Sequence, residues 1–359
     1  VSYYLGNGST NAAYQKLTQT VEEGTVVTFA KVPARTGYVN QGWSSKKNSE
    51  KATAKAKCTV NKNITLYAVQ KKAVQLTFHR CDGSTWQKTT LAKGSSYSLP
   101  GVRDAEGYTF IGWSTKPMQS VSPQYEAEEK ITVNGNVDLY AVVFNRTTET
   151  DLTEDQLPQV DIYKYKQVIF VGDSRTEFME NVLTGMGESA TKNVKFVCSA
   201  GKGLDWFTTT GWAQLYSIVQ HDSNSILSKK TAVIFNFGVN DLSKSADYAE
   251  YYNWIAPQLK SKGCELYFMS VNPVNRLMLP NAGRADRSEA AVRSFNQYMK
   301  ANLSSAYTYI DMYSYLKSTG YSFASDHYGT GTVDDGLHYT TRTYKRIFAK
   351  CMDSLRVPA

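Results

Sequence analysis

The stretch Val-Ile-Phe-Val-Gly-Asp-Ser-Arg-Thr at residues 168–176 decides the fold of the C-terminal part of this sequence. Its first four residues are apolar and mostly β-branched, which predicts a buried strand. Gly172 then permits a tight turn, and a helix that begins near Thr176 would place Ser174 at the end of that strand. A serine there is a candidate nucleophile, although the tripeptide Gly-Asp-Ser at residues 172–174 is also common in ordinary loops.

Four further strand-like runs follow, at residues 194–197, 232–237, 266–269 and 307–310. Between the later runs, residues 246–261 and 287–303 carry apolar positions at three- and four-residue spacing, which predicts helices. This alternation predicts right-handed βαβ units and a parallel sheet covered by helices on both faces. In such a sheet, functional groups gather where the strands end at their carboxyl edge.

Two more segments place polar side chains at strand ends or in turns. The run at 232–237 continues as Gly-Val-Asn-Asp, in which Asn240 either caps the next helix or donates from its amide to a developing oxyanion. Near the C-terminus, Asp335 precedes His338 by three residues across a turn that contains glycine. This spacing allows the carboxylate to hold one imidazole nitrogen while the other nitrogen faces a serine. His327, which follows Asp326, is a competing histidine.

Four blocks in this order resemble the SGNH (GDSL-type) hydrolase family: Gly172-Asp173-Ser174, Gly201-Lys202-Gly203, Gly238-Val239-Asn240-Asp241 and Asp335-Gly336-Leu337-His338. The resemblance covers about residues 160–357 and implies a flavodoxin-like three-layer α/β/α domain with a parallel sheet. It also implies a serine esterase in which Ser174 attacks, His338 transfers protons and Asp335 orients the imidazole ring. No metal or cofactor is required. The implied oxyanion hole consists of the Ser174 N–H, the Asn240 amide and a glycine N–H, which is Gly203 by strand register, with Gly201 as the alternative.

Three residues beside these blocks are candidates for binding substrate. Arg175 either forms an ion pair within the protein or attracts an acidic substrate, and Trp206 and Tyr339 either pack in the core or stack on sugar rings. Enzymes of the family act on esters of sugars, lipids, peptidoglycan and small alcohols. We expect O-acetyl esters of carbohydrate as the substrate. The alternatives are a lysophospholipase or short-chain lipid esterase, and a surface adhesin without catalysis.

The first 145 residues contain an internal repeat. Gly-Tyr-Val-Asn-Gln-Gly-Trp-Ser at residues 37–44 returns as Gly-Tyr-Thr-Phe-Ile-Gly-Trp-Ser at 107–114, and Leu-Tyr-Ala-Val at 66–69 returns at 139–142. Short alternating stretches between turn residues predict small β-sheets, with Trp43 and Trp113 in their cores rather than on a sugar-binding surface. These units resemble the β-grasp-like Listeria–Bacteroides repeat, which implies a secreted or bacterial cell-surface protein.

The predicted organisation is two β-rich repeat domains at 1–72 and 73–145, a linker at 146–160 and the hydrolase domain at 161–359. Most of the net charge of +8 lies in the first 145 residues, which contain 17 Lys and Arg and 10 Asp and Glu. This charge is typical of a solvated surface, or of contact with an anionic cell wall or polysaccharide. No nucleic-acid-binding motif accompanies it, and no apolar run is long enough to span a membrane. The five cysteines are scattered without metal-site spacing.

Overall fold

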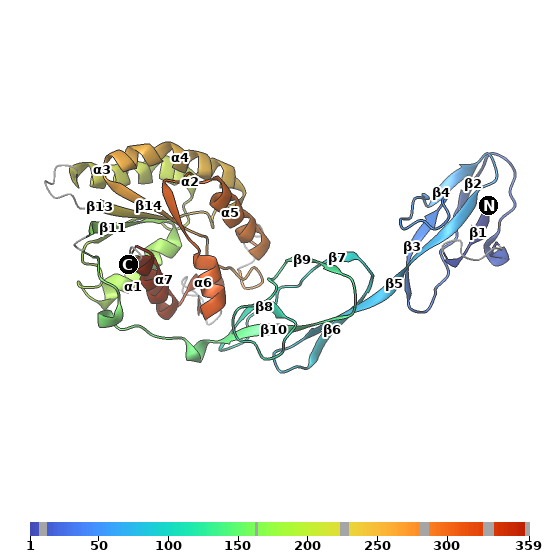
Figure 1. The fold of residues 1–359 in the computed structure, drawn as a ribbon, viewed down its shortest axis with the longest axis horizontal. Helices are drawn as coiled ribbons and strands as arrows, with labels where there is room; N and C mark the ends of the chain where they lie inside the picture. Colours follow the sequence, from blue (N-terminus) through green and yellow to red (C-terminus); the bar gives the residue numbers. More distant parts are fainter. Residues whose placement is uncertain (7–12, 162–163, 223–229, 280–286, 326–333, 356–359) are drawn as a thin grey trace. The chain divides into compact units, whose positions relative to one another are not determined.

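A computed structural model describes residues 1–6, 13–161, 164–222, 230–279, 287–325 and 334–355 (Figure 1). The contacts within the chain define two compact units. The first consists of Val1–Ser98 and Lys130–Tyr140, and the second of Leu99–Glu129 and Ala141–Ala359. The middle of the second repeat therefore belongs to the same compact unit as the hydrolase part.

The two repeats are built around a shared strand, β5 (Thr65–His79). Its first half pairs in parallel with β1 and in antiparallel orientation with β3. Its second half pairs in parallel with β10 and in antiparallel orientation with β6. Each repeat also has a short antiparallel pair, β2 with β4 or β7 with β9. The bounds of the other strands are β1 Ser2–Tyr4, β2 Thr25–Thr28, β3 Tyr38–Ser44, β4 Lys57–Val60, β6 Thr85–Ala92, β7 Ser95–Ser98, β8 Tyr108–Ser114, β9 Lys130–Val133 and β10 Val137–Asn145.

The Gly-Trp pair of each repeat forms its core, as predicted. Trp43 and Trp113 are 5% and 0% exposed. Their indole N–H groups donate to the carbonyls of Ala30 and Pro100, at 2.6 and 2.8 Å. The glycine before Trp113 has φ +155°, and a side chain at this position would overlap Pro123 and a backbone carbonyl. The repeated motif is thus explained by packing and backbone conformation.

The hydrolase part contains a five-stranded parallel sheet in the order β12-β11-β13-β14-β15. Every predicted strand run is present, so the predicted fold class is confirmed. The order reverses between β11 and β13, which places the ends of these two neighbouring strands at the switch point where α/β proteins bind ligands. The bounds are β11 Tyr165–Gly172, β12 Val194–Cys198, β13 Lys230–Asn236, β14 Cys264–Met269 and β15 Tyr307–Ile310.

Helices cover both faces of this sheet (Figure 1). Alternate residues of β11 point to opposite faces: Ile169 and Val171 pack with α3, α4 and α5, whereas Val168 and Phe170 pack with α1, α6 and α7. Within the described residues, every helix is too short or too polar to cross a bilayer. The helices are α1 Ser174–Met186, α2 Leu204–Trp206, α3 Trp212–Asp222, α4 Ser245–Ser261, α5 Glu289–Asn302, α6 Met312–Thr319 and α7 Thr341–Ser354, with a π-helical turn at Phe207–Gly211 and 3₁₀ turns at Gln15–Leu17, Arg146–Thr148, Glu154–Gln156 and Leu242–Lys244.

The segment 146–160, predicted as a linker, is packed onto the hydrolase part. The Glu149 carboxylate is buried and accepts hydrogen bonds from Arg346 at 2.8 Å and from the hydroxyls of Thr343 and Ser322 at 2.5 Å. Leu157 and Val160 from the same segment join the core on the α1 and α7 side of the sheet. A buried carboxylate with three partners anchors this segment, so it does not act as a free spacer.

Candidate active site

The candidate nucleophile lies at the junction of β11 and α1. Asp173 caps the helix, because its carboxylate accepts from the Arg175 N–H at 3.0 Å. A side chain at Gly172 would overlap Thr176, so only glycine allows the strand to turn this closely into the helix. Ser174 is therefore in the first turn of α1, where backbone N–H groups have no intrahelical acceptor and the helix dipole favours negative charge.

Ser174, His338 and Asp335 are hydrogen-bonded in series. The distance from His338 Nε2 to Ser174 Oγ is 2.9 Å, and from His338 Nδ1 to Asp335 Oδ2 it is 2.5 Å. All three side chains are buried. If Nδ1 donates its proton to the carboxylate, Nε2 is left as the acceptor for the serine hydroxyl. The ring of Phe178 meets the imidazole edge-on, with centroids 4.6 Å apart, and limits its movement.

The position of the Asp335 carboxylate is set by its own strand, β17 (Asp334–Tyr339), which pairs with β16 (Phe323–Ser325). Asp335 Oδ1 accepts from the backbone N–H groups of Leu337 at 2.8 Å and His338 at 2.7 Å. Burial alone would raise the pKa of this carboxyl, but the hydrogen bond and charge of His338 and the two N–H groups outweigh burial and lower it. Asp335 is therefore a carboxylate at neutral pH.

The pKa of Asp173, in the Gly-Asp-Ser block, shifts in the opposite direction to that of Asp335. Burial raises the pKa of its carboxyl to about 6, and the nearby charges of Arg175 and Arg287 offset only part of this effect. The helix-capping bond makes Asp173 a structural residue of the Gly-Asp-Ser turn. Its place before a predicted helix was a signal that sequence reasoning could have used.

The predicted oxyanion donors lie on two adjacent turns. Asn240 Nδ2 donates to the Lys202 carbonyl at 2.7 Å, while its Oδ1 accepts from Arg287. The amide has a second N–H, which the first contact leaves available. Gly203 precedes α2, and a side chain there would overlap the Asp241 carboxylate, whereas Gly201 has φ +70° and open space around it. The turn lies beside the end of β11, because the Ser199 N–H donates to the Gly172 carbonyl at 3.3 Å.

Arg175 is buried, with its guanidinium bonded within the protein. It is 2% exposed, and its guanidinium donates to three backbone carbonyls: Leu337 at 3.0 Å, Asn272 at 2.9 Å and Pro273 at 2.9 Å. These contacts use donors on all three guanidinium nitrogens within a buried site. Arg175 instead ties the start of α1 to the residue before His338 and to the loop after β14.

Tyr339 is also unavailable for sugar stacking, because it is 1% exposed and its ring stacks on Phe323. Its hydroxyl donates to the Pro273 carbonyl at 2.5 Å. Trp206 is half-buried, with its ring 6.0 Å from that of Phe237, and its predicted contact with substrate stays a prediction. The competing His327 and the preceding Asp326 lie outside the described residues.

Sequence reasoning missed two features around the site. Arg287 is buried against Asn240, and no local pattern distinguishes it from other arginines. The Asn272 side chain is 1% exposed, and its amide has no hydrogen-bond partner within the described residues. In the same described ranges, no group of three or more His, Cys, Asp or Glu residues is arranged to hold a metal ion.

The family model described as GDSL-like Lipase/Acylhydrolase matches residues 168–351, which is more than half of the chain. The chain belongs to this acylhydrolase family. All four sequence blocks lie inside the matched range. The model of the Listeria-Bacteroides repeat domain matches residues 1–69 and 75–142. The two predicted family resemblances are thus both confirmed.

Several solved structures are similar to parts of the chain. An acylhydrolase-type protein of Bacteroides fragilis is 16% identical, with 56% of this chain and 92% of that chain covered and a TM-score of 0.38. An acetyl xylan esterase is 11% identical, with 53% of this chain and 100% of that chain covered and a TM-score of 0.35. The catalytic domain of peptidoglycan O-acetyltransferase A of Streptococcus pneumoniae is 16% identical, with 53% of this chain and 92% of that chain covered and a TM-score of 0.33. No curated protein matches the sequence.

Proposed function

We propose that this acylhydrolase is an extracellular serine esterase that removes O-acetyl groups from carbohydrate through an acyl-enzyme. The observation that carries the proposal is the hydrogen-bonded series Ser174, His338 and Asp335 at the carboxyl end of β11. A buried serine with a histidine acceptor on one side and a helix N-terminus at its own backbone is suited to acyl transfer.

In the first half-reaction, Ser174 Oγ forms a bond to the acyl carbon while His338 Nε2 takes the hydroxyl proton. The imidazolium is stabilised by the Asp335 carboxylate, which does not itself take the proton. When the tetrahedral intermediate collapses, the bond to the alcohol breaks and His338 returns the proton to the leaving oxygen. Water then repeats the sequence on the acyl-serine and releases the acid, with the proton restored to Ser174.

The oxyanion of each intermediate would be held by the Ser174 N–H, the free N–H of the Asn240 amide and the Gly203 N–H. Arg287 supports this role, since its contact with Asn240 Oδ1 draws electron density from the amide and fixes which way the N–H groups point. Removal of one such donor in other hydrolases costs on the order of 100- to 1,000-fold in kcat. We expect a loss of this size for Asn240→Ala.

The substrate assignment rests on the repeats as well as the site. Listeria-Bacteroides repeats are typical of extracellular proteins, and in this chain they are basic, which favours an anionic cell-wall or polysaccharide surface as the setting. Trp206, half-buried at the end of the short helix α2 that follows Gly203, is the aromatic residue that we propose contacts the sugar.

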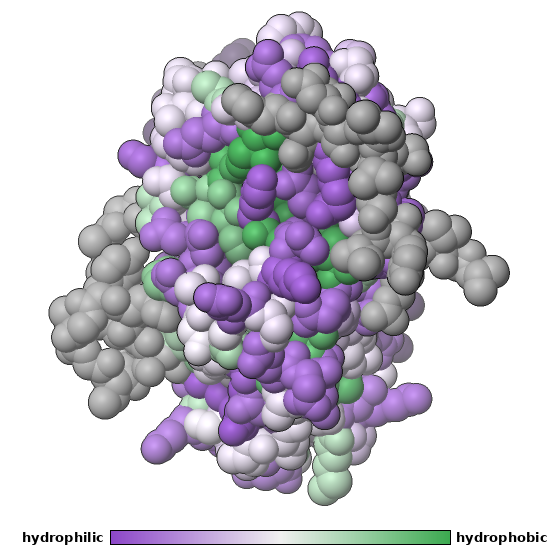
Figure 2. All heavy atoms as spheres, turned by 90° about the vertical axis from the view of Figure 1, so that its left-hand side faces the viewer, coloured by the Kyte–Doolittle hydropathy of each residue, from purple (hydrophilic) through white to green (hydrophobic). Residues whose placement is uncertain are grey.

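One observation favours a short-chain lipid ester as a second candidate. A depression of about 620 Å³ runs along α1 and α7, and its lining includes Phe178, Val182 and Met186. Phe178 also contacts the His338 ring, so the depression begins beside the site. Figure 2 shows one side of the molecule on which hydrophobic side chains form a patch among hydrophilic ones. The apolar side chains in the lining of the depression suit the acyl chain of such an ester.

Hydrolysis of p-nitrophenyl acetate and p-nitrophenyl octanoate by the intact chain and by Ser174→Ala tests both assignments. We expect Ser174→Ala to abolish turnover above background, and the acetyl ester to be the better substrate because a small acyl site excludes the longer chain. Release of acetate from acetylated polysaccharide would then identify the natural class. Equal rates for the two proteins would leave a sugar-binding adhesin as the better description.

A further inference from the structure

The middle of the second repeat, residues 99–129, packs into the hydrolase part. Ile111 of β8 is fully buried in the core formed with α1, α6 and α7. Its carbonyl accepts from the buried Lys317 of α6 at 2.8 Å, and the same ammonium lies 3.0 Å from Glu126 of the repeat and 3.0 Å from Glu289 of α5. A buried lysine between two carboxylates, one from each side, requires both sides to be in place.

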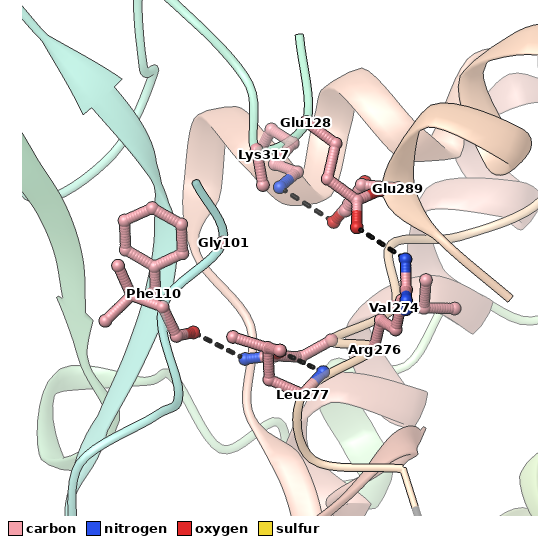
Figure 3. A pocket seen from close by; sticks show the side chains of 11 residues that line it. Gly101, Phe110, Glu128, Val274, Arg276, Leu277, Glu289 and Lys317 are labelled. Atoms are coloured by element: carbon pink, nitrogen blue, oxygen red, sulfur yellow. Dashed lines mark hydrogen bonds and ion pairs between the residues drawn. The ribbon is translucent and has the colours of Figure 1, made fainter. Parts of the chain in front are cut away.

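A second set of contacts joins the repeat to the loop that follows β14. In this loop Asn275 Nδ2 donates to the Val102 carbonyl at 3.1 Å and to Asp104 Oδ1 at 2.9 Å. Arg103 donates in turn to the Leu277 carbonyl. Figure 3 shows the two sides facing each other, with Gly101, Phe110 and Glu128 of the repeat opposite Val274, Arg276 and Leu277 of the loop.

The loop in turn contacts the strand that carries the histidine. The Asn275 N–H donates to the Gly336 carbonyl at 2.8 Å, between Asp335 and His338 in sequence. Gly336 has φ +66°, and a side chain there would overlap the Asn275 carbonyl and Met278. The loop therefore packs directly against the Asp-Gly-Leu-His turn, so that a shift of the loop would displace the turn.

The repeat side of this connection is held firmly. The Asp104 side chain is 0% exposed and pairs with Arg146 at 2.9 Å. Asp104 Oδ1 also accepts from the Phe110 N–H at 2.9 Å, which fixes the carboxylate to the start of β8. Asn275 thus lies between a fixed acceptor in the repeat and the backbone beside the catalytic pair. We call this series Asp104, Asn275 and Gly336 the bridge.

We propose that residues 99–129 of the second repeat are a structural component of the catalytic centre, and that the bridge positions the Asp335–His338 turn against Ser174. The proposal rests on the proposed esterase function. Asp104 and Asn275 touch no reacting atom, so they are positioning residues. The interaction surface that the repeat offers is specific for this chain's own loop at 274–278, whereas a spacer module would need no such complementarity.

Two variants of the full chain test this, one on each side of the bridge: Asn275→Asp, which replaces the donor by an acceptor facing Asp104, and Asp104→Ala. Asn253→Asp is the matched control, because it makes the same change at an amide of α4, which donates to the Asn302 carbonyl of α5, away from the bridge. Val133→Ala, a buried core position of β9, is the control for loosening of the repeat itself.

For each protein we would measure kcat and KM for p-nitrophenyl acetate, the melting temperature, and hydrogen exchange of the backbone at residues 335–339. A misplacement of catalytic groups by a fraction of an ångström to 1 Å costs up to on the order of 100-fold in rate. We expect the bridge variants to lose about 10- to 100-fold in kcat with KM unchanged and to exchange faster at 335–339. The controls keep kcat within about 2-fold.

Titration of Ser174 with a fluorophosphonate gives the fraction of folded, competent enzyme, so that lost protein is not counted as lost rate. Bridge variants that keep the kcat and exchange protection of the intact chain would overturn the proposal. Loss of kcat in Val133→Ala equal to that in Asp104→Ala would also overturn it, since general loosening of the repeat would then suffice. A Ser174→Ala variant as active as the intact chain would instead refute the esterase function on which the proposal rests.

Discussion

Replacing Asp335 by asparagine should inactivate the enzyme through the histidine tautomer, with almost no change in shape. Asp335 Oδ1 is held by two backbone N–H groups, from Leu337 and His338. The asparagine oxygen will occupy that position, because the amide nitrogen cannot accept from an N–H group. The amide N–H groups must then face His338 Nδ1, where the carboxylate oxygen now lies at 2.5 Å.

A donor at that position turns His338 Nδ1 into an acceptor and moves the ring proton to Nε2. Nε2 then presents an N–H to Ser174 Oγ, 2.9 Å away, and cannot take the serine proton. The same substitution in serine proteases lowers kcat by on the order of 10⁴, equivalent to about 5 kcal/mol in the activation free energy. The melting temperature should change little, since the two backbone N–H groups keep their acceptor.

The assay is kcat for p-nitrophenyl acetate at pH 7.5, with active enzyme counted by mass spectrometry of the folded protein. Asp138→Asn is the control, because Asp138 is a surface carboxylate that also pairs with a histidine, His79, in the repeat. We expect full activity for this control. A folded Asp335→Asn enzyme that retains more than about a tenth of the kcat would refute the reasoning, because the tautomer would then have no catalytic effect.

Three further predictions concern the surroundings of the site. Arg175→Lys should lower the free energy of unfolding by about 2–4 kcal/mol, because one ammonium cannot replace the guanidinium as donor to three buried carbonyls. We expect KM to be unchanged. Urea titration and steady-state kinetics would contradict this if they showed a raised KM at unchanged stability. Asp173 keeps its proton in the native state up to about pH 6. Its pKa therefore makes stability fall by about 2 kcal/mol between pH 4 and 6 as pH rises, and Asp173→Asn should remove that slope from urea midpoints measured across the range. Lys317→Met should destabilise by about 3–5 kcal/mol in thermal or urea unfolding, since Glu289 and Glu126 lose their buried partner, and an unchanged unfolding midpoint would contradict this.

Much of the hydrolase fold could be predicted because its signals are local. The runs at 168–171 and 232–237 predicted two adjacent strands of the sheet, and the helix predicted at 246–261 is α4, Ser245–Ser261. Ser174, Asn240 and His338 could be named as candidates for the same reason: each follows a strand or occupies a turn with a recognisable pattern. The alternatives for Arg175 and Tyr339 stayed open at the level of sequence, because neighbours in sequence do not show whether a side chain points to solvent or into the core, as these two do.

By itself, the sequence determined the order of strands and helices, the two repeats and the candidate residues Ser174, Asp335 and His338, since each depends on side-chain periodicity or on residues within a few positions of one another. The tertiary structure decided what holds these groups in place. The contact of Asn275 with Asp104 joins residues 171 positions apart, that of Arg175 with Leu337 joins residues 162 apart, and that of Glu149 with Arg346 joins residues 197 apart. Such contacts form after distant segments pack together, so burial and hydrogen bonding at these positions follow from the whole fold rather than from any local pattern.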